Sequence, residues 1–500
     1  MKKEIDWTTM LVPFAIVVAL MAVFMLYPDS SKSVVDTLRG FFGDTIGIYY
    51  PILAIGAVIC SLYVALTPKY GNVRLGNTDK PIYNNFQWGT MIFTSTMAAD
   101  IMFYSLIEWA LYGGEQHVQD LGGLQMWAPT FTLFHWGPLA WGFYVILAVC
   151  FAFMIHVRQR PRQRFSEACR PLLGKCVDGM WGKIIDITAI FAIVCATATT
   201  FSLATPLLTN AMGSVFGFQP TTAITIVVLL LICAVYTITV LFGLTGISKL
   251  ASICSYLFFA VLLYFFFLGG ETRYIIETGF QSLGNMAQNF IGMATYMDPL
   301  RENGFAQNWT IYYWAYWLVW CVATPFFIAL ISKGRTIRNV VFGSFGWGLA
   351  GTYLSFIILG NYGLAQQMKH GVDAIGHIGM GGEMYEAILM IFDTLPLPWL
   401  ALILLCITMI AFYSTTLDGI TYVTSSYSYK EITPDEEPSR GIRGFWSIML
   451  ILLPIALLFA ENSLYSLQGV TIIAAFPIGI LLVLIVISFF KDFRKWISER

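Results

Sequence analysis

The chain has 500 residues, of which 57% are hydrophobic and only 11% are charged, and its formal net charge at pH 7 is −1. Such a composition lies outside the range of soluble globular domains and indicates a polytopic, all-helical protein embedded in the lipid bilayer. The near-zero net charge argues against a nucleic-acid partner.

Apolar runs long enough to cross a bilayer predict twelve transmembrane helices. These runs fall at residues 8–27, 47–66, 87–112, 129–157, 183–211, 219–242, 248–269, 309–332, 340–364, 397–424, 443–460 and 468–490. An even number of spans places both termini on one side of the membrane. If that side is the cytoplasm, the outer segments hold, of the 28 Lys and Arg, only Lys32, Arg39, Arg273, Arg301 and Lys369. The positive-inside rule therefore predicts a multi-pass plasma (inner) membrane protein with both termini cytoplasmic.

Two further segments are apolar on one side without being spans. Between Glu271 and Arg301 the pattern is amphipathic, which predicts a helix lying along the outer surface. The apolar part of Gly381 to Leu395 is too short to cross, so we expect a second surface or re-entrant helix on the same side.

The third span carries a carboxylate, Asp100, near the membrane centre. Placing an acid there costs roughly 2.5 to 3.5 kcal/mol on insertion scales, so Asp100 is expected to face a cavity or a partner. Glu108, Asp186 and Asp418 also fall in spans. For Glu108 and Asp418 a structural, hydrogen-bonded role is the preferred interpretation.

Two spans carry clusters of aromatic residues. On the fourth span, Trp141 and Tyr144 share a face, and Trp136 lies about 1.4 turns back, beyond Pro138. On the eighth span, Asn308 to Arg338, one face holds Tyr313, Trp317 and Trp320, with Tyr316 on its shoulder. Such a face suits a methylated cation, which cannot donate hydrogen bonds and is held best over several rings. The alternatives are a packed helix interface and an interfacial aromatic belt.

The run WTIYYWAYW followed by ISKGRTIR resembles the signature segment of the betaine/choline/carnitine transporter (BCCT) family. The segments FHWGPLAW, IEWALY and SLATPL also match, and the resemblance extends from about Asn72 to the C-terminus. It implies a secondary transporter with no enzymatic activity, a LeuT-like fold with a five-helix inverted repeat, and a homotrimer. A membrane-embedded enzyme and a channel are the remote alternatives, and no nucleophile with a base or metal cage is visible at membrane depth.

The inverted repeat would divide the chain into five parts. These are the peripheral helices 1–86, the first repeat 87–270, an external connecting helix 271–308, the second repeat 309–490 and a short cytoplasmic tail 491–500. The first span of each repeat has a helix-weakening spot at mid-depth, at Met97-Ala98-Ala99-Asp100 and at Ala323-Thr324-Pro325. Proline removes a backbone donor and often marks a broken helix.

The resemblance also implies a site. The fourth and eighth spans would each supply half of an aromatic box, made of Trp136, Trp141 and Tyr144 facing Tyr316, Trp317 and Trp320. The family usually has a Trp pair where this chain has Tyr316-Trp317, which leaves the head-group size open. Asp100 lies where betaine carriers have a glycine-rich stretch, and an acid there is similar to the choline-carrying members.

A sodium site is expected by the same resemblance. Thr415 and Thr416, preceded by Phe412, would supply one half, and carbonyls near Thr94 and Met97 the other. The alternative is that the paired Thr hydroxyls bond back to their own helix. Sodium-independent carnitine exchangers carry an arginine where this chain has Cys254, which favours ion coupling here.

The sequence thus predicts a secondary transporter of a small methylated ammonium compound. No cofactor is expected, apart from sodium as the coupling ion. A cation such as choline or trimethylamine ranks above the zwitterions betaine and carnitine, because a carboxylate near Asp100 would be repelled. A transporter or exchanger of those zwitterions is the alternative, with Asp100 protonated or structural. Symport or antiport, and sodium or proton coupling, stay open.

Overall fold

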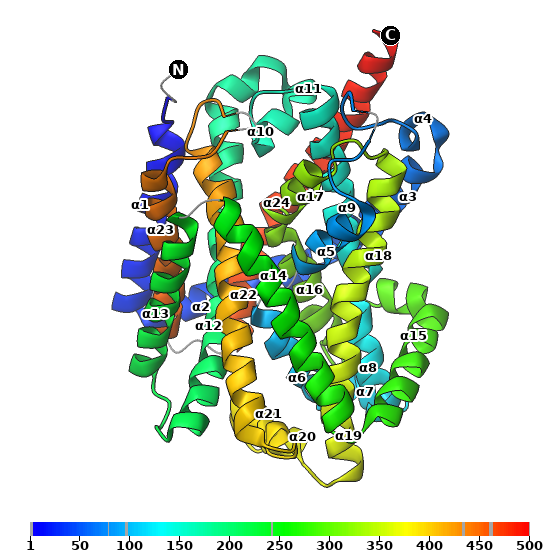
Figure 1. Cartoon of the computed structure of the whole chain (residues 1–500), viewed down its shortest axis with the longest axis vertical. Coiled ribbons are helices and arrows are strands. Elements are labelled where there is room, and N and C mark those ends of the chain that lie inside the picture. Colours follow the sequence, from blue (N-terminus) through cyan, green and yellow to red (C-terminus); the bar gives the residue numbers. More distant parts are fainter. Residues whose placement is uncertain are drawn as a thin grey trace.

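The structure is a computed structural model that describes residues 4–78, 80–95, 99–241, 244–432, 436–459 and 464–499. Most of these residues are helical. They contain no β-strand beyond two isolated bridges, Ile5 with Tyr429 and Arg74 with Thr336. Most of the long helices run along the long axis of the molecule (Figure 1), and α1 begins at the same end as α24 finishes. The all-helical fold predicted from composition is therefore confirmed for the described residues.

The first half of the chain contains α1 Trp7–Leu26, α2 Pro28–Arg39, η1 Gly40–Thr45, α3 Tyr49–Leu66, α4 Pro68–Gly71, α5 Asn85–Ser95, α6 Ala99–Gly113, α7 Gln116–Asp120, α8 Leu124–His135, α9 Pro138–Ala152, η2 Phe153–Val157, α10 Phe165–Ala168, α11 Arg170–Leu173, η3 Gly174–Asp178, α12 Met180–Phe216 and α13 Thr222–Leu241. The second half contains α14 Leu244–Leu263, η4 Tyr264–Leu268, α15 Thr272–Thr295, η5 Ala306–Thr310, α16 Ile311–Trp320, α17 Thr324–Ile331, α18 Ile337–Ser355, η6 Phe356–Gly360, α19 Asn361–Lys369, α20 Ala374–Gly379, α21 Met384–Phe392, α22 Pro398–Tyr427, α23 Arg440–Phe459 and α24 Leu464–Ser498.

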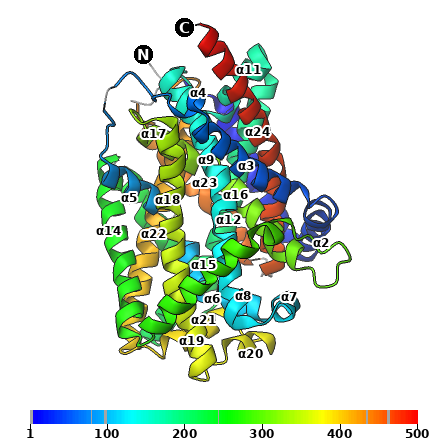
Figure 2. The same ribbon diagram turned by 90° about the vertical axis from the view of Figure 1, so that its right-hand side faces the viewer.

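Within the described residues, eight helices are long and apolar enough to cross a membrane, or ten if each of two bent pairs counts as one span. This supports a multi-pass membrane protein, while the count of twelve and the inverted repeat remain predictions. The predicted span at 87–112 contains α5 and α6, and the one at 219–242 corresponds to α13. Residues 96–98, which include Met97 and Ala98 of the predicted helix-weakening spot, lie outside the described residues. The amphipathic segment forms α15, which turns by 111° from the preceding helix and packs on α8 (Figure 2).

Proline positions account for two interruptions of the membrane helices. The eighth predicted span breaks after Trp320 and resumes as α17 with Pro325 in its first turn, and the two pieces are bent by 52°. The break predicted at Ala323-Thr324-Pro325 is thus confirmed. In the fourth span, α8 ends at His135 and α9 starts at Pro138, because proline disfavours helical geometry in the residue before it and Gly137 is extended. That second interruption was not predicted.

One buried guanidinium joins three helices at the end of the molecule that holds both termini. Arg164 donates to the carboxylates of Asp6 (3.1 Å) and Asp186 (3.2 Å), and also to the backbone carbonyls of Tyr427 (2.9 Å) and Tyr429. These partners lie before α1, near the start of α12 and at the end of α22. Asp186 therefore has a structural ion-pairing role.

A cluster of aromatic rings lies around α7, away from the end that holds both termini (Figures 1 and 2). His117 stacks on Tyr296 with ring centroids 4.2 Å apart, and Phe131 lies 4.6 Å from Phe305. The contacts of Arg164 and this ring cluster thus join helices by different means, ionic in the first and aromatic in the second.

Candidate functional site

The aromatic run of the eighth predicted span forms α16, all ten residues of which are buried. This helix packs against α9, α12, α3 and α24, so aromatic side chains leave it in every direction. A helix that is hydrophobic all round belongs in the interior of a protein, as this one does. The interfacial aromatic belt is excluded by this burial.

Trp317 is the shared member of the aromatic box. Its ring centroid lies 5.7 Å from Trp136, 5.7 Å from Trp141 and 4.8 Å from Tyr144, with interplanar angles of 69°, 55° and 56°. At these distances and angles the rings meet at a slant and do not stack flat on one another. Within the described residues Trp136 and Trp141 make no ring contact with each other, so Trp317 is the ring that joins them. The structure thus brings four of the predicted binding residues together.

The remaining two aromatics of the predicted box differ in their surroundings. Tyr316 lies 6.3 Å from Trp136, centroid to centroid, and its hydroxyl is 2.9 Å from Thr200 Oγ1. Trp320, the last residue of α16, is buried, but it makes no ring contact with other box members in the described part of the chain. Its place in the box stays a prediction.

A four-residue stripe on α6 was missed from the sequence as a unit. Asp100, Tyr104, Glu108 and Tyr112 recur at every fourth position and therefore share one helix face. Tyr104 lies 5.7 Å from Trp136 and 6.3 Å from Tyr316, and its hydroxyl is 2.7 Å from that of Tyr312. The spacing of polar residues in an apolar span was the signal that could have shown it.

Asp100 is 3% exposed and lies in the first turn of α6. Its carboxyl interacts with the Thr200 side chain, which in turn contacts Tyr316, and its Oδ1 atom has no hydrogen-bond partner. The carboxyl also interacts electrostatically with the phenols of Tyr104 and Tyr144. A buried acid with one unsatisfied oxygen thus lies beside the aromatic box. The partner that was expected for it, because burying an acid is costly, is the Thr200 side chain.

Glu108 is fully buried and bonded to the box itself. Its Oε2 accepts a 2.8 Å hydrogen bond from the indole N–H of Trp136, and its Oε1 accepts one from the Tyr112 hydroxyl. The hydrogen bonds expected of Glu108 are therefore present, while its structural role stays a prediction. The side chain of Asp418 lies outside the described residues.

The predicted sodium site is described only in part. The hydroxyl of Thr415 lies 3.3 Å from the carbonyl of Ala411 and 3.1 Å from that of Phe412, and Cys254 Sγ lies 3.8 Å away. Thr415 therefore bonds back to its own helix, as the alternative required, although its oxygen lone pairs remain available to a cation. Met97 and the Thr94 side chain lie outside the described residues, so the other half is not placed.

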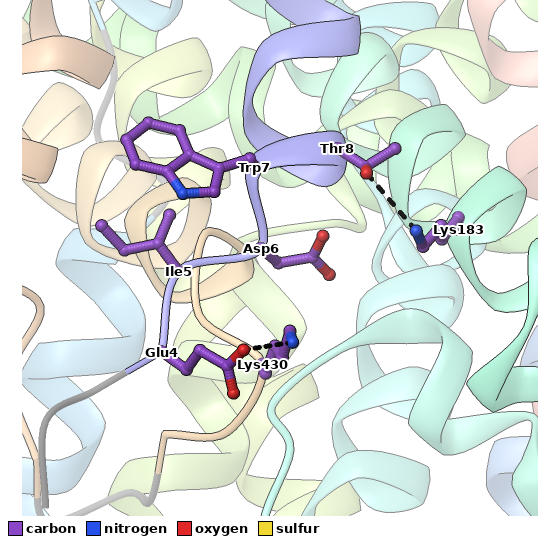
Figure 3. A pocket seen from close by; sticks show the side chains of 7 residues that line it. All are labelled: Glu4, Ile5, Asp6, Trp7, Thr8, Lys183 and Lys430. Atoms are coloured by element: carbon purple, nitrogen blue, oxygen red, sulfur yellow. Dashed lines mark hydrogen bonds and ion pairs between the residues drawn. The ribbon is translucent and has the colours of Figure 1, made fainter.

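A hollow of about 680 Å³ lies at the start of the chain, remote from the aromatic box (Figure 3). Two lysines line this hollow: Lys430 forms an ion pair with Glu4, and Lys183 donates a 3.3 Å hydrogen bond to Thr8 Oγ1. Burial alone would raise the pKa of Asp6, but the Arg164 guanidinium and hydrogen bonds with Thr9 outweigh it and hold that pKa below its ordinary value. These contacts fix the N-terminal segment and offer no aromatic cage.

Comparison with known proteins identifies the family of the chain. Residues 8–497 match the family described as "BCCT, betaine/carnitine/choline family transporter". The chain is also similar to "Uncharacterized transporter YeaV" of Escherichia coli (strain K12), with 27% identity over 455 residues, covering 90% of this chain and 92% of that protein.

Proposed function

Because the chain belongs to the betaine/carnitine/choline family of membrane transporters and is not an enzyme, we propose that it carries a methylated ammonium cation, choline or trimethylamine, by sodium-coupled alternating access. The observation that carries the proposal is that the ring of Trp317 contacts those of Trp136, Trp141 and Tyr144. A cation within about 6 Å of several ring centroids gains roughly 0.5 to 2 kcal/mol from each.

The preference for a cation over a zwitterion rests on Asp100. This acid lies beside the box and forms no ion pair with Lys or Arg in the described part of the chain. A second carboxylate brought close to it would be repelled strongly in a low-dielectric site, whereas an ammonium would be attracted.

A zwitterion remains the second candidate because of two other atoms. The buried indole N–H groups of Trp141 and Trp317 have no hydrogen-bond acceptor. A buried donor without an acceptor is costly, and an oxygen on the substrate would satisfy it. The carboxylate of betaine or carnitine offers such an oxygen, and so does the hydroxyl of choline, which ranks choline above trimethylamine.

The test is a binding screen of choline, trimethylamine, glycine betaine and carnitine by intrinsic tryptophan fluorescence. We expect Asp100→Gly to weaken binding of the cations several-fold and to leave glycine betaine unchanged or improved. Asp100→Asn is the matched control, because it removes the charge but keeps a side chain that reaches Thr200. A wild-type preference for betaine or carnitine, or a full cation preference in Asp100→Gly, would refute the charge argument.

Sodium coupling is supported by the hydroxyl pair on α22. Cys254 lies next to Thr415, at the position where the resemblance places the arginine of sodium-independent exchangers. We expect Thr415→Ala with Thr416→Ala to abolish the dependence of uptake on a sodium gradient. Thr408→Ala is the matched control, since Thr408 also bonds back within α22, to Leu404. Wild-type uptake indifferent to sodium would refute the coupling, and protons would be the next candidate.

The family also suggests a homotrimer in the plasma (inner) membrane with both termini cytoplasmic. Native mass spectrometry of the detergent-extracted protein tests the first, and protease access to a terminal tag in oriented vesicles tests the second. Counterflow in liposomes separates a carrier from a channel, because only a carrier exchanges labelled for unlabelled substrate.

A further inference from the structure

Four buried polar side chains form a hydrogen-bonded chain that starts at Glu108, which bonds to Trp136 of the aromatic box. From Glu108 it continues through Tyr112, whose hydroxyl is 2.7 Å from His135 Nδ1, and His135 Nε2 is 3.0 Å from Thr310 Oγ1. Each of the four residues is at most 3% exposed. The chain thus joins α6, α8 and η5 through continuous hydrogen bonds.

The donors and acceptors in this chain can be arranged in two ways. With Glu108 ionised, Thr310 donates to His135 Nε2, His135 Nδ1–H donates to the Tyr112 oxygen, and Tyr112 donates to Glu108 Oε1. Neutral imidazole carries only one N–H, so the direction of one bond fixes the direction of the others.

Adding one proton reverses every bond in the chain. Glu108 Oε1–H then donates to the Tyr112 oxygen, Tyr112 donates to His135 Nδ1, and His135 Nε2–H donates to Thr310 Oγ1. Each of the three hydrogens has moved by one position toward Glu108, Thr310 has received the added proton, and the only net change of charge is the loss of the carboxylate charge. The Trp136 N–H bond to Glu108 Oε2 is satisfied in both arrangements.

Few other charged groups act on this carboxyl. The titratable groups that interact with it are Tyr104 and Tyr112 on its own helix, Tyr313 and Tyr312 on α16, and His135 through Tyr112. On α22, which also packs on α6, Tyr413 interacts with Asp100. No Lys or Arg forms an ion pair with Glu108 within the described residues. The charge of Glu108 is therefore balanced by hydrogen bonds alone, which leaves it free to respond to a cation nearby.

Resting on the proposed function for its ligand, we infer that Glu108, Tyr112, His135 and Thr310 form a proton-binding site that competes with the cation held against Trp136. Glu108 acts on the box through its bond to the Trp136 indole. A cation over that ring favours the ionised carboxylate, and protonation removes the attraction. Binding of the cation therefore releases a proton, and acid weakens binding by up to about tenfold per pH unit.

Three variants separate this site from a purely structural acid. Glu108→Gln holds the chain in its protonated arrangement, because the Gln N–H can donate to Tyr112 while its oxygen accepts from Trp136. We expect this variant to fold and, when it is combined with Asp100→Asn, to bind choline with an affinity that no longer depends on pH. Glu108→Ala should lose binding, because the indole N–H of Trp136 then has no acceptor. Asp100→Asn is the control for the other carboxyl near the box, and it should bind more weakly but keep the pH dependence.

The experiment measures choline affinity by tryptophan fluorescence from about pH 5 to about pH 9, the range in which perturbed buried groups titrate, together with proton release to a dye in weak buffer. Infrared spectroscopy of the ligand-free protein follows the carboxylic C=O band over the same range. We expect a titrating band in Asp100→Asn that is absent when Glu108→Gln is added. If no methylated ammonium compound binds, the proposed function fails, while the infrared titration still decides the proton site. Affinity of Asp100→Asn independent of pH, retained pH dependence in the double variant, or the absence of a titrating band in Asp100→Asn would each overturn the inference.

Discussion

Gly348 on α18 makes room for Trp141, and filling that room tests whether the position of this indole controls binding. A Cβ atom at Gly348 would lie 2.2 Å from Cη2, 2.3 Å from Cζ2 and 2.4 Å from Cζ3 of Trp141. Favourable carbon contacts need about 3.5 Å, so in Gly348→Ala the ring must retreat by roughly 1.3 Å or more. Trp141 is fully buried, so this retreat disturbs its contacts with Trp317 and Tyr144.

The magnitude follows from two opposing effects. Overpacking a filled interior destabilises a protein by about 1 to 3 kcal/mol, and replacing Gly by Ala inside a helix stabilises it by about 1 kcal/mol. We therefore expect Gly348→Ala to lower the free energy of unfolding by about 0 to 2 kcal/mol. Affinity for the methylated ammonium ligand should fall several-fold, because the displaced ring no longer faces the cation.

Gly346→Ala on the same helix is the matched control, since its new Cβ would have no atom within 4 Å. It should leave affinity unchanged and raise stability slightly. Thermal unfolding in detergent and ligand titration by tryptophan fluorescence measure both quantities. Wild-type affinity in Gly348→Ala would show that the exact position of Trp141 does not matter, and equal loss in both variants would point to α18 itself.

Two further perturbations address other features. If cation–π attraction holds the ligand, Trp317→Leu and Trp141→Leu should each weaken binding several-fold or more, and the Phe replacements should weaken it less. Equal damage from Leu and Phe would exclude the mechanism. Burial alone would raise the pKa of Glu271, but its bonds to Lys369 and His370 outweigh it and leave the pKa below the ordinary value of 4.5. The stabilisation is then present above pH 4.5 and is lost as pH falls through the lowered pKa, so the acid-side drop in thermal stability should be smaller in Glu271→Gln.

Local sequence signals predicted much of the architecture. Hydrophobicity indicated the membrane class, and Pro325 gave the break before α17 because a proline effect is local. Pro138 carried the same signal in the fourth span, yet the span was read as continuous because its apolar run extends across the break.

Helical spacing alone predicted the candidate site only as two separate halves, and the family resemblance was needed to pair them. The pairing of Trp317 with Trp136, Trp141 and Tyr144 agrees with the box that the resemblance implied. Tyr104 and His135 were missed because their roles depend on contacts between helices far apart in sequence, which helical spacing cannot supply. The structure adds these residues as the hydrogen-bonded and aromatic surroundings of the box.

The contacts of Arg164 and the rings around α7 differ in their thermodynamic properties. Separating the helices around this guanidinium would exchange protein hydrogen bonds for bonds to water, with a small net change for most of them. The freed ions would then be screened by salt, so high ionic strength favours separation of these helices. Parting the rings of His117, Tyr296, Phe131 and Phe305 would instead expose apolar surface and raise the heat capacity. Ionic strength thus acts on the contacts of Arg164, and temperature acts on the rings around α7.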